Sequence, residues 1–115
     1  MTSRFPRRFE DDGTNVTVDV HGCSVADAIY IVRRSVQEAH RRGRARVVVI
    51  HGMSSQAGAV RTIKSDLERR IANGEFEMWI SGSTQDSVGG RTTLWTTIGG
   101  TRNPKLIKAA DVVRP

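Results

Sequence analysis

The chain has 115 residues, of which 37% are hydrophobic and 26% are charged, and it carries a formal net charge of +6 at pH 7. This length allows one hydrophobic core and excludes two independent ones, and the composition is that of a globular protein rather than a disordered or fibrous one. The excess of arginine and lysine favours phosphate-bearing partners, and no apolar run is long enough to predict a membrane helix.

The first half of the chain predicts a βαβ unit. Residues 1–14 show neither helical nor strand periodicity, and we expect a flexible N-terminal arm there. Residues 16–20 have the alternation of a strand, and residues 25–42 carry apolar side chains at helical spacing, with Ser24 suited to cap this helix and Gly43 to end it. The continuous apolar run at residues 47–50 then predicts a buried parallel strand.

The second half predicts one more helix and two more strands. Apolar positions between residues 60 and 71 indicate a helix that ends at Gly74, and residues 76–80 and 92–98 indicate strands joined by a polar loop at residues 81–91. Residues 99–115 are expected to form a basic C-terminal tail or a short docked helix. The predicted domain, residues 15–98, is a two-layer α/β sandwich of βαβαββ order, with a four-stranded mixed sheet and two helices.

Two histidine–glycine pairs fall at the ends of the two predicted parallel strands. The first strand is followed by His21 and Gly22, with Asp19 just before them, and the second is followed by His51 and Gly52. A right-handed crossover brings these strand ends to the same edge of the sheet, where open α/β sheets bind their ligands. The sequence therefore predicts a site at this edge.

The residue types at this edge suit phosphodiester chemistry. Because side chains alternate along a strand, Asp19 and His21 should share one face, where the carboxylate can fix the tautomer of an imidazole that moves a proton during cleavage. His51 can be the complementary acid or a phosphate ligand, and Gly22 and Gly52 let a phosphate approach the backbone closely. The alternative is that each histidine makes a structural hydrogen bond in a strand-to-helix turn.

These segments resemble the Smr (small MutS-related) domain family. Residues 18–22 (Val-Asp-Val-His-Gly), the helix start at residues 24–28 and residues 48–52 (Val-Val-Ile-His-Gly) are similar to the family's LDxHG and HGxG motifs, and the resemblance covers residues 16–98. It implies a fold similar to the carboxy-terminal domain of translation initiation factor three, binding of DNA or RNA, and nicking endonuclease activity. By matched position, it implies a catalytic role for Asp19 and His21 and nucleic-acid contacts for His51 and Gly52.

The loop after Gly52 departs from the family pattern. Position 54 is a serine where the HGxG motif has glycine, and the next glycine is Gly58. Serine hydroxyls can donate hydrogen bonds to a phosphate in place of backbone amides. The residues expected to bind nucleic acid are Gly22, Gly52, Ser54, Ser55, Gly58, Arg61, Lys64 and Arg91.

Two further features can serve nucleic-acid binding. Six arginines between residues 33 and 46 can follow a phosphate backbone, although an ordinary solvated helix face has the same composition. Trp79 and Trp95 lie in the last two predicted strands, and at least one is expected in the core. An exposed tryptophan would be a stacking platform for unpaired bases.

The leading functional prediction is an endonuclease acting on structured DNA or RNA, with a role in repair or recombination. The alternatives are a non-catalytic nucleic-acid-binding module and a protein-interaction appendage of a larger repair or translation factor. We expect nucleic acid as the partner, within a MutS-like or translation-associated assembly, and no membrane. One carboxylate and two histidines predict no certain cofactor, although Mg²⁺ or Mn²⁺ can assist such chemistry. A single cysteine and the absence of a leader pattern favour the cytoplasm.

Overall fold

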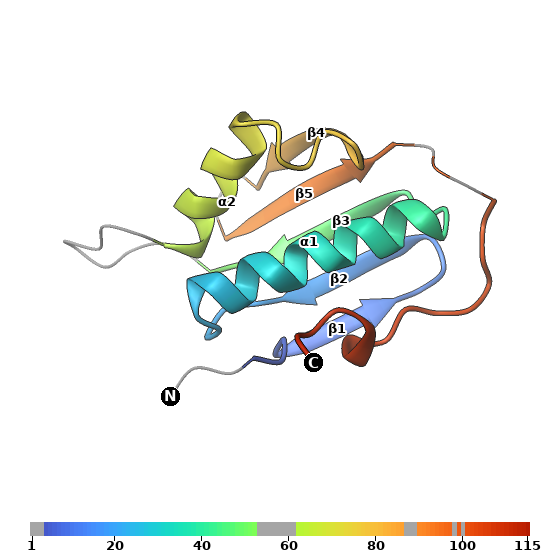
Figure 1. Ribbon diagram of the computed structural model, residues 1–115, viewed down its shortest axis with the longest axis horizontal. Coiled ribbons are helices and arrows are strands. Elements are labelled where there is room, and N and C mark those ends of the chain that lie inside the picture. Colours follow the sequence, from blue (N-terminus) through green and yellow to red (C-terminus); the bar gives the residue numbers. More distant parts are fainter. Residues whose placement is uncertain (1–3, 53–61, 87–89, 98, 100) are drawn as a thin grey trace.

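The computed structural model describes residues 4–52, 62–86, 90–97, 99 and 101–115 as a mixed β-sheet with two α-helices on one face (Figure 1). The elements in chain order are β1 (Arg8–Asp11), β2 (Asn15–Asp19), α1 (Val25–Arg41), β3 (Arg46–Ile50), α2 (Ile63–Ala72), β4 (Ile80–Gln85), β5 (Arg91–Thr96) and a short 3-10 helix, η1 (Ala109–Asp111). The strand order is β1-β2-β3-β5-β4, with β2 and β3 parallel and all other neighbours antiparallel. The predicted α/β class, mixed sheet and two helices are confirmed.

The βαβ unit forms where the sequence predicts it because its apolar positions are buried together. Val16 and Val18 of β2 and Val47 and Val49 of β3 are fully buried in the core with the apolar face of α1. The Ser24 hydroxyl caps α1 by accepting a hydrogen bond from the backbone N–H of Asp27 at 3.1 Å. The opposite face of β2 and β3 is left for partly exposed side chains.

The sheet has five strands, so the prediction of four is wrong. The additional strand, β1, lies inside residues 1–14, which the sequence indicated to be an arm, and pairs antiparallel with β2. Only two of its side chains face inward: Phe9 packs against the core, and Asp11 is a buried carboxylate. A four-residue edge strand with one apolar residue has too little alternation to be recognised.

The last two strands differ from the prediction as well. Residues 76–79 form turns in which the rings of Phe76 and Trp79 pack with centroids 6.5 Å apart, and β4 begins only at Ile80. Most of β4 therefore lies in the segment predicted to be a loop. Its polar composition suits an edge strand, because polar side chains disfavour pairing with another sheet.

The C-terminal segment docks on the domain through two buried apolar side chains. It runs round the end of the sheet from β5 to the side of β1 and α1, where η1 lies (Figure 1). Ile107 and Val112 are buried in the core. The segment is thus part of the packed structure.

Candidate functional site

Asp19, His21 and Arg7 form a chain of hydrogen bonds where β2 ends. Asp19 Oδ1 accepts from the backbone N–H of His21 at 3.1 Å and lies 3.2 Å from Nδ1 of the same residue. Arg7 Nη1 lies 2.6 Å from Nε2 and 3.3 Å from Nδ1 of His21, so the guanidinium contacts the face of the imidazole beside both ring nitrogens. The His21 side chain is 46% exposed, so a substrate can reach it.

Arg7 is a member of this site that the sequence analysis missed. Its backbone N–H donates to the carbonyl of Asp19 at 2.8 Å, which continues the pairing of β1 with β2 and brings the guanidinium over the imidazole. The sequence offers little to find it, because Phe9 is the one apolar residue between positions 7 and 12.

His51 lies at the same edge but is buried, with 7% of its surface exposed. Its Nδ1–H donates to the carbonyl of Gly52 at 2.9 Å, and its Nε2 accepts from the Thr92 hydroxyl at 2.9 Å. Burial lowers the pKa of His51, which favours this neutral ring. Both ring nitrogens of His51 are engaged within the protein, which is the structural alternative considered for each histidine.

The two histidine–glycine pairs converge as the crossover geometry requires. A side chain at Gly52 would contact the Cβ of His21 at 3.5 Å, and the amides of His51 and Gly52 both donate to the carbonyl of Gly90, at 3.1 and 3.2 Å. Gly22 and Gly52 have φ angles of +92° and +76°, in the left-handed region that favours glycine. These two turns therefore bring the ends of β2 and β3 against each other.

The expected nucleic-acid-binding residues are only partly described. Arg91 is exposed at the start of β5, opposite Ile50. Lys64 lies in the first turn of α2, near enough to His51 for its charge to lower the pKa of that ring, after burial. Ser54, Ser55, Gly58 and Arg61 lie outside the described residues.

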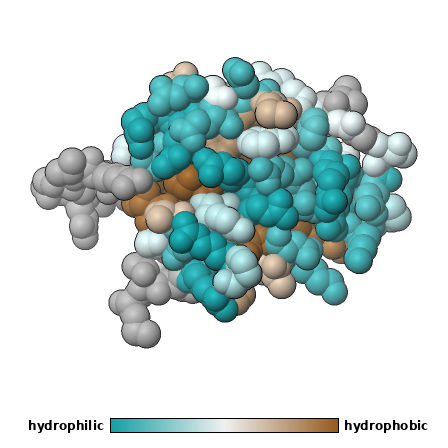
Figure 2. All heavy atoms as spheres, viewed as in Figure 1, coloured by the Kyte–Doolittle hydropathy of each residue, from teal (hydrophilic) through white to brown (hydrophobic). Residues whose placement is uncertain are grey.

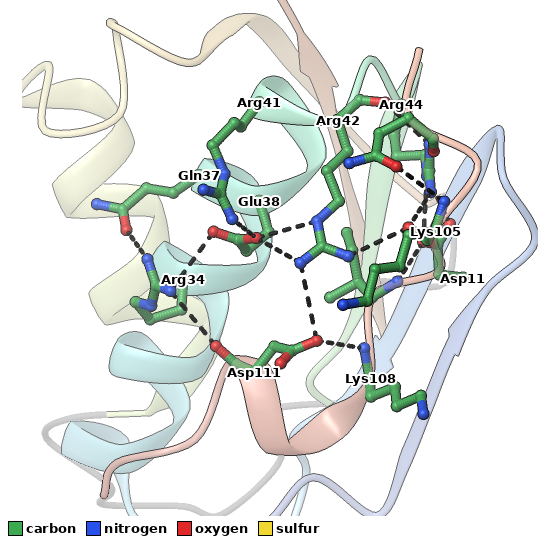
Figure 3. Close-up of polar contacts among 12 residues, drawn as sticks. Asp11, Arg34, Gln37, Glu38, Arg41, Arg42, Arg44, Lys105, Lys108 and Asp111 are labelled. Atoms are coloured by element: carbon green, nitrogen blue, oxygen red, sulfur yellow. Dashed lines mark hydrogen bonds and ion pairs between the residues drawn. The ribbon is translucent and has the colours of Figure 1, made fainter.

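Most of the arginines between residues 33 and 46 are held in ion pairs rather than left free for phosphates. Glu38, which is 4% exposed, pairs with Arg34, Arg41 and Arg42 at 3.5, 2.5 and 3.0 Å (Figure 3). Arg44 is buried against Asp11 at 2.8 Å. Figure 2 shows that the helix-bearing face is mainly hydrophilic, but its cations are largely neutralised by these partners.

Two classes of feature are absent from the described part of the chain. It contains no group of three or more His, Cys, Asp or Glu side chains arranged to hold a metal ion. It also has no helix of the length and apolar character needed to cross a membrane.

The pH dependence of stability tests whether His51 is buried in its neutral form. The pKa of His51 is lowered from 6.5, first by burial, so the unfolded chain takes up a proton before the folded one as the pH falls. We expect the free energy of unfolding to fall below about pH 6.5, by about 1.4 kcal/mol for each pH unit that separates the two pKa values. Urea unfolding at pH 7.5, 6.5 and 5.5 measures this loss. His51→Gln, which cannot titrate, should lose less; an equal loss would contradict the assignment.

Comparison with known proteins identifies the family. The model of the Smr domain matches residues 18–77, more than half of the 115 residues, and the chain therefore belongs to the Smr domain family. Its fold is similar to that in the crystal structure of the Smr domain of Thermus thermophilus MutS2, with a TM-score of 0.56 and 19% sequence identity over 70% of this chain and 96% of that chain. No curated protein matches the chain.

Proposed function

We propose that this Smr domain binds structured DNA or RNA and nicks it at the edge formed by β2 and β3. The observation that carries the proposal is the exposed chain of carboxylate, imidazole and guanidinium made by Asp19, His21 and Arg7. A carboxylate that orients an imidazole, next to a cation that suits a phosphate, is the arrangement that general-base cleavage of a phosphodiester requires.

In the proposed mechanism, Arg7 and His21 separate when substrate binds. The scissile phosphate draws the Arg7 guanidinium away from His21 Nε2, because a phosphate oxygen is a stronger acceptor than a neutral ring nitrogen. Asp19 keeps the Nδ1 proton in place, so Nε2 is free to take a proton from the attacking group. This group is a water molecule or, in RNA, a ribose hydroxyl. As the new P–O bond forms, the bond to the leaving sugar oxygen breaks, and that oxygen takes a proton from solvent.

The neighbouring groups have supporting roles in this proposal. His51 is a positioning residue, because its ring ties Thr92 of β5 to the turn at Gly52, against which His21 packs. Lys64 and Arg91 add positive charge on either side of the edge and favour the approach of the phosphate backbone.

The test is a nicking assay on supercoiled DNA and on a structured RNA, with and without Mg²⁺ or Mn²⁺. The wild-type protein should convert supercoiled to open circular DNA or cleave the RNA. The double variant Asp19→Ala/His21→Ala should lose about 10²–10⁴-fold in rate, which is the usual contribution of a positioned general base. Intact substrates with the wild-type protein, or an unchanged rate in the double variant, would contradict the proposed activity.

A non-catalytic binding module is the second candidate. The observation in its favour is that the Arg7 guanidinium lies over the imidazole, 2.6 Å from His21 Nε2 and 3.3 Å from Nδ1, where it hinders access to the base unless substrate displaces it. This candidate predicts salt-sensitive binding of nucleic acid with no turnover, and binding that survives the loss of His21. Measuring affinity and cleavage on the same oligonucleotides distinguishes the two.

A further inference from the structure

The face of the sheet opposite the helices carries an exposed tryptophan and two arginines. In Figure 1 both α1 and α2 lie on one face of the sheet. Buried side chains alternate with Arg46, Arg91 and Trp95 along β3 and β5, so these three point to the opposite face. No described helix covers this face. Of the two tryptophans, at least one of which was expected in the core, Trp95 is on the surface, with 39% of its area exposed, and Trp79 is partly buried against the core.

The indole of Trp95 is held in place by its neighbours. The guanidinium carbon of Arg46 lies 5.4 Å from the ring centroid, and the indole N–H donates to the Thr84 hydroxyl at 3.4 Å. A ring that is already ordered loses little side-chain entropy when a second flat group stacks on it.

A hollow of about 290 Å³ lies on this face of the sheet, and among its lining residues Arg46 is the strand partner of Trp95. Arg46 and Arg91 both line it, together with Thr84, Thr93 and Asp86. Its volume is at the lower end for ligand pockets, about 300–1,000 Å³, which suits a single nucleobase better than a larger ligand. The hydroxyls and the Asp86 carboxylate offer acceptors for the amino group of a base.

The arginines of this face differ from those of α1 in whether they pair with a carboxylate. Among the described residues, no carboxylate forms an ion pair with Arg46 or Arg91, and Arg46 donates only to the neutral amide oxygen of Asn15, at 3.0 Å. The helix arginines, by contrast, share Glu38. Arg46 and Arg91, on the open sheet face, are therefore available to phosphates.

We propose that this surface binds an unpaired segment of nucleic acid. We call it the sheet platform and define it as Arg46, Thr84, Arg91, Thr93 and Trp95. One base stacks on Trp95, and backbone phosphates contact Arg46 and Arg91, which stand about 13 Å apart along the sheet, four residues at the usual rise of a strand.

The platform leads to the proposed cleavage site. Arg91 pairs with Ile50, and Ile50 pairs with Asp19, so the three residues form one row across β5, β3 and β2. A strand bound on the platform therefore reaches Asp19 within about 10 Å, two strand spacings. This inference rests on the proposed function for its ligand class, and it specifies a substrate with single-stranded nucleotides next to the cleaved bond.

The experiment compares binding of labelled 12-nucleotide single strands, DNA and RNA, with binding of the matching blunt duplexes, by fluorescence anisotropy. Single strands should bind more tightly. Trp95→Ala should weaken their binding by about 5- to 100-fold, which is the usual contribution of one stacked base, whereas Trp95→Phe should retain most of it.

Arg91→Ala should lower the slope of log affinity against log salt by about 0.7, the value for one phosphate of a single strand. Arg41→Ala, on the helix face, is the matched control and should change neither quantity.

Two outcomes would overturn the inference: a folded Trp95→Ala that binds single strands like the wild type, or a wild-type protein that binds no single strand, as expected if a protein partner occupies this face. A normal melting temperature establishes that the variant is folded. Failure of the proposed cleavage is a separate result. Loss of single-strand binding in Trp95→Ala supports the platform even if no substrate is nicked, and nicking that is lost in the Asp19/His21 variant supports the active site even if Trp95 is dispensable.

Discussion

Replacement of Asp11 by alanine should lower the free energy of unfolding by about 3–5 kcal/mol, the cost of leaving one partner of a buried ion pair without the other. The side chains of Asp11 and Arg44 are both fully buried, with Arg44 Nε 2.8 Å from Asp11 Oδ1. Asp11 Oδ2 also accepts from the backbone N–H of Ile107 at 2.8 Å, and Oδ1 from that of Gly13 at 2.9 Å. One carboxylate thus joins β1, the turn that leads into β3 and the C-terminal segment.

Arg44 extends this junction to the backbone of the C-terminal segment. Its guanidinium donates to the carbonyls of Asn103 and Lys105 at 2.7 and 3.1 Å (Figure 3 shows the contact region). Without Asp11, this cation stays buried with carbonyl dipoles alone, so we expect the docked segment to loosen together with the global loss of stability.

Urea unfolding of wild type, Asp11→Ala and Glu10→Ala measures the effect. Glu10 is the matched control, because it lies on the same strand and pairs with Arg8 at the surface, where such pairs contribute about 0–1 kcal/mol. A loss below 1 kcal/mol in Asp11→Ala would contradict the expected role of the pair.

The Asp11 carboxylate also makes the free energy of unfolding depend on pH in the acid range. Burial raises the pKa of Asp11, but the Arg44 guanidinium and the amides of Ile107 and Gly13 outweigh it and hold the pKa below its ordinary value. Because the unfolded carboxyl titrates near pH 3.9, its stabilising share should be complete above about pH 4 and should be lost as the pH falls further. Asp11→Ala should lack that component of the acid transition.

How much of the fold the sequence predicts depends on burial. β2 and α1 follow from periodicity because their valines and isoleucines recur at strand or helix spacing and are buried on one side, and β3 follows from its continuous apolar run. β1 and β4 do not, because each is an edge strand with few buried side chains, and the inward Asp11 of β1 breaks the apolar pattern. The pairing that stabilises β1 lies 33 positions along the chain, at Arg44.

The candidate site, like the fold, has contacts that the sequence predicts and contacts that it does not. The meeting of His21 with Gly52 was predictable, because a parallel crossover fixes where two strand ends lie. The spacing of Glu38 from Arg34, Arg41 and Arg42 also indicates their pairing, because each arginine is three or four positions from Glu38 along the chain. Arg7 was not predictable, because its place over His21 depends on β1 joining the sheet.

Arg7→Ala therefore tests a site residue that the structure identifies and the sequence pattern does not. We expect it to reduce the proposed cleavage by about 10²–10³-fold, the usual cost of removing one group that stabilises developing charge. The loss has two physical causes: the guanidinium that would neutralise the phosphate is gone, and so is its contact with the ring of His21 in the free protein. Stability should change little, since the backbone bond from residue 7 to the Asp19 carbonyl is kept.

Cleavage rates of Arg7→Ala, Arg7→Lys and Arg8→Ala on one substrate give the test. Arg8 is the adjacent control, because it pairs with Glu10 at the surface, away from His21. Lysine keeps the charge but lacks the planar, forked donors of arginine, so Arg7→Lys should recover only part of the rate. A merely structural role for Arg7 predicts a lowered melting temperature and equal rates for alanine and lysine at saturating substrate. Wild-type rates in Arg7→Ala would show that Arg7 has no place in the reaction. An equal loss in Arg8→Ala would show that positive charge near β1 matters in general and not Arg7 in particular.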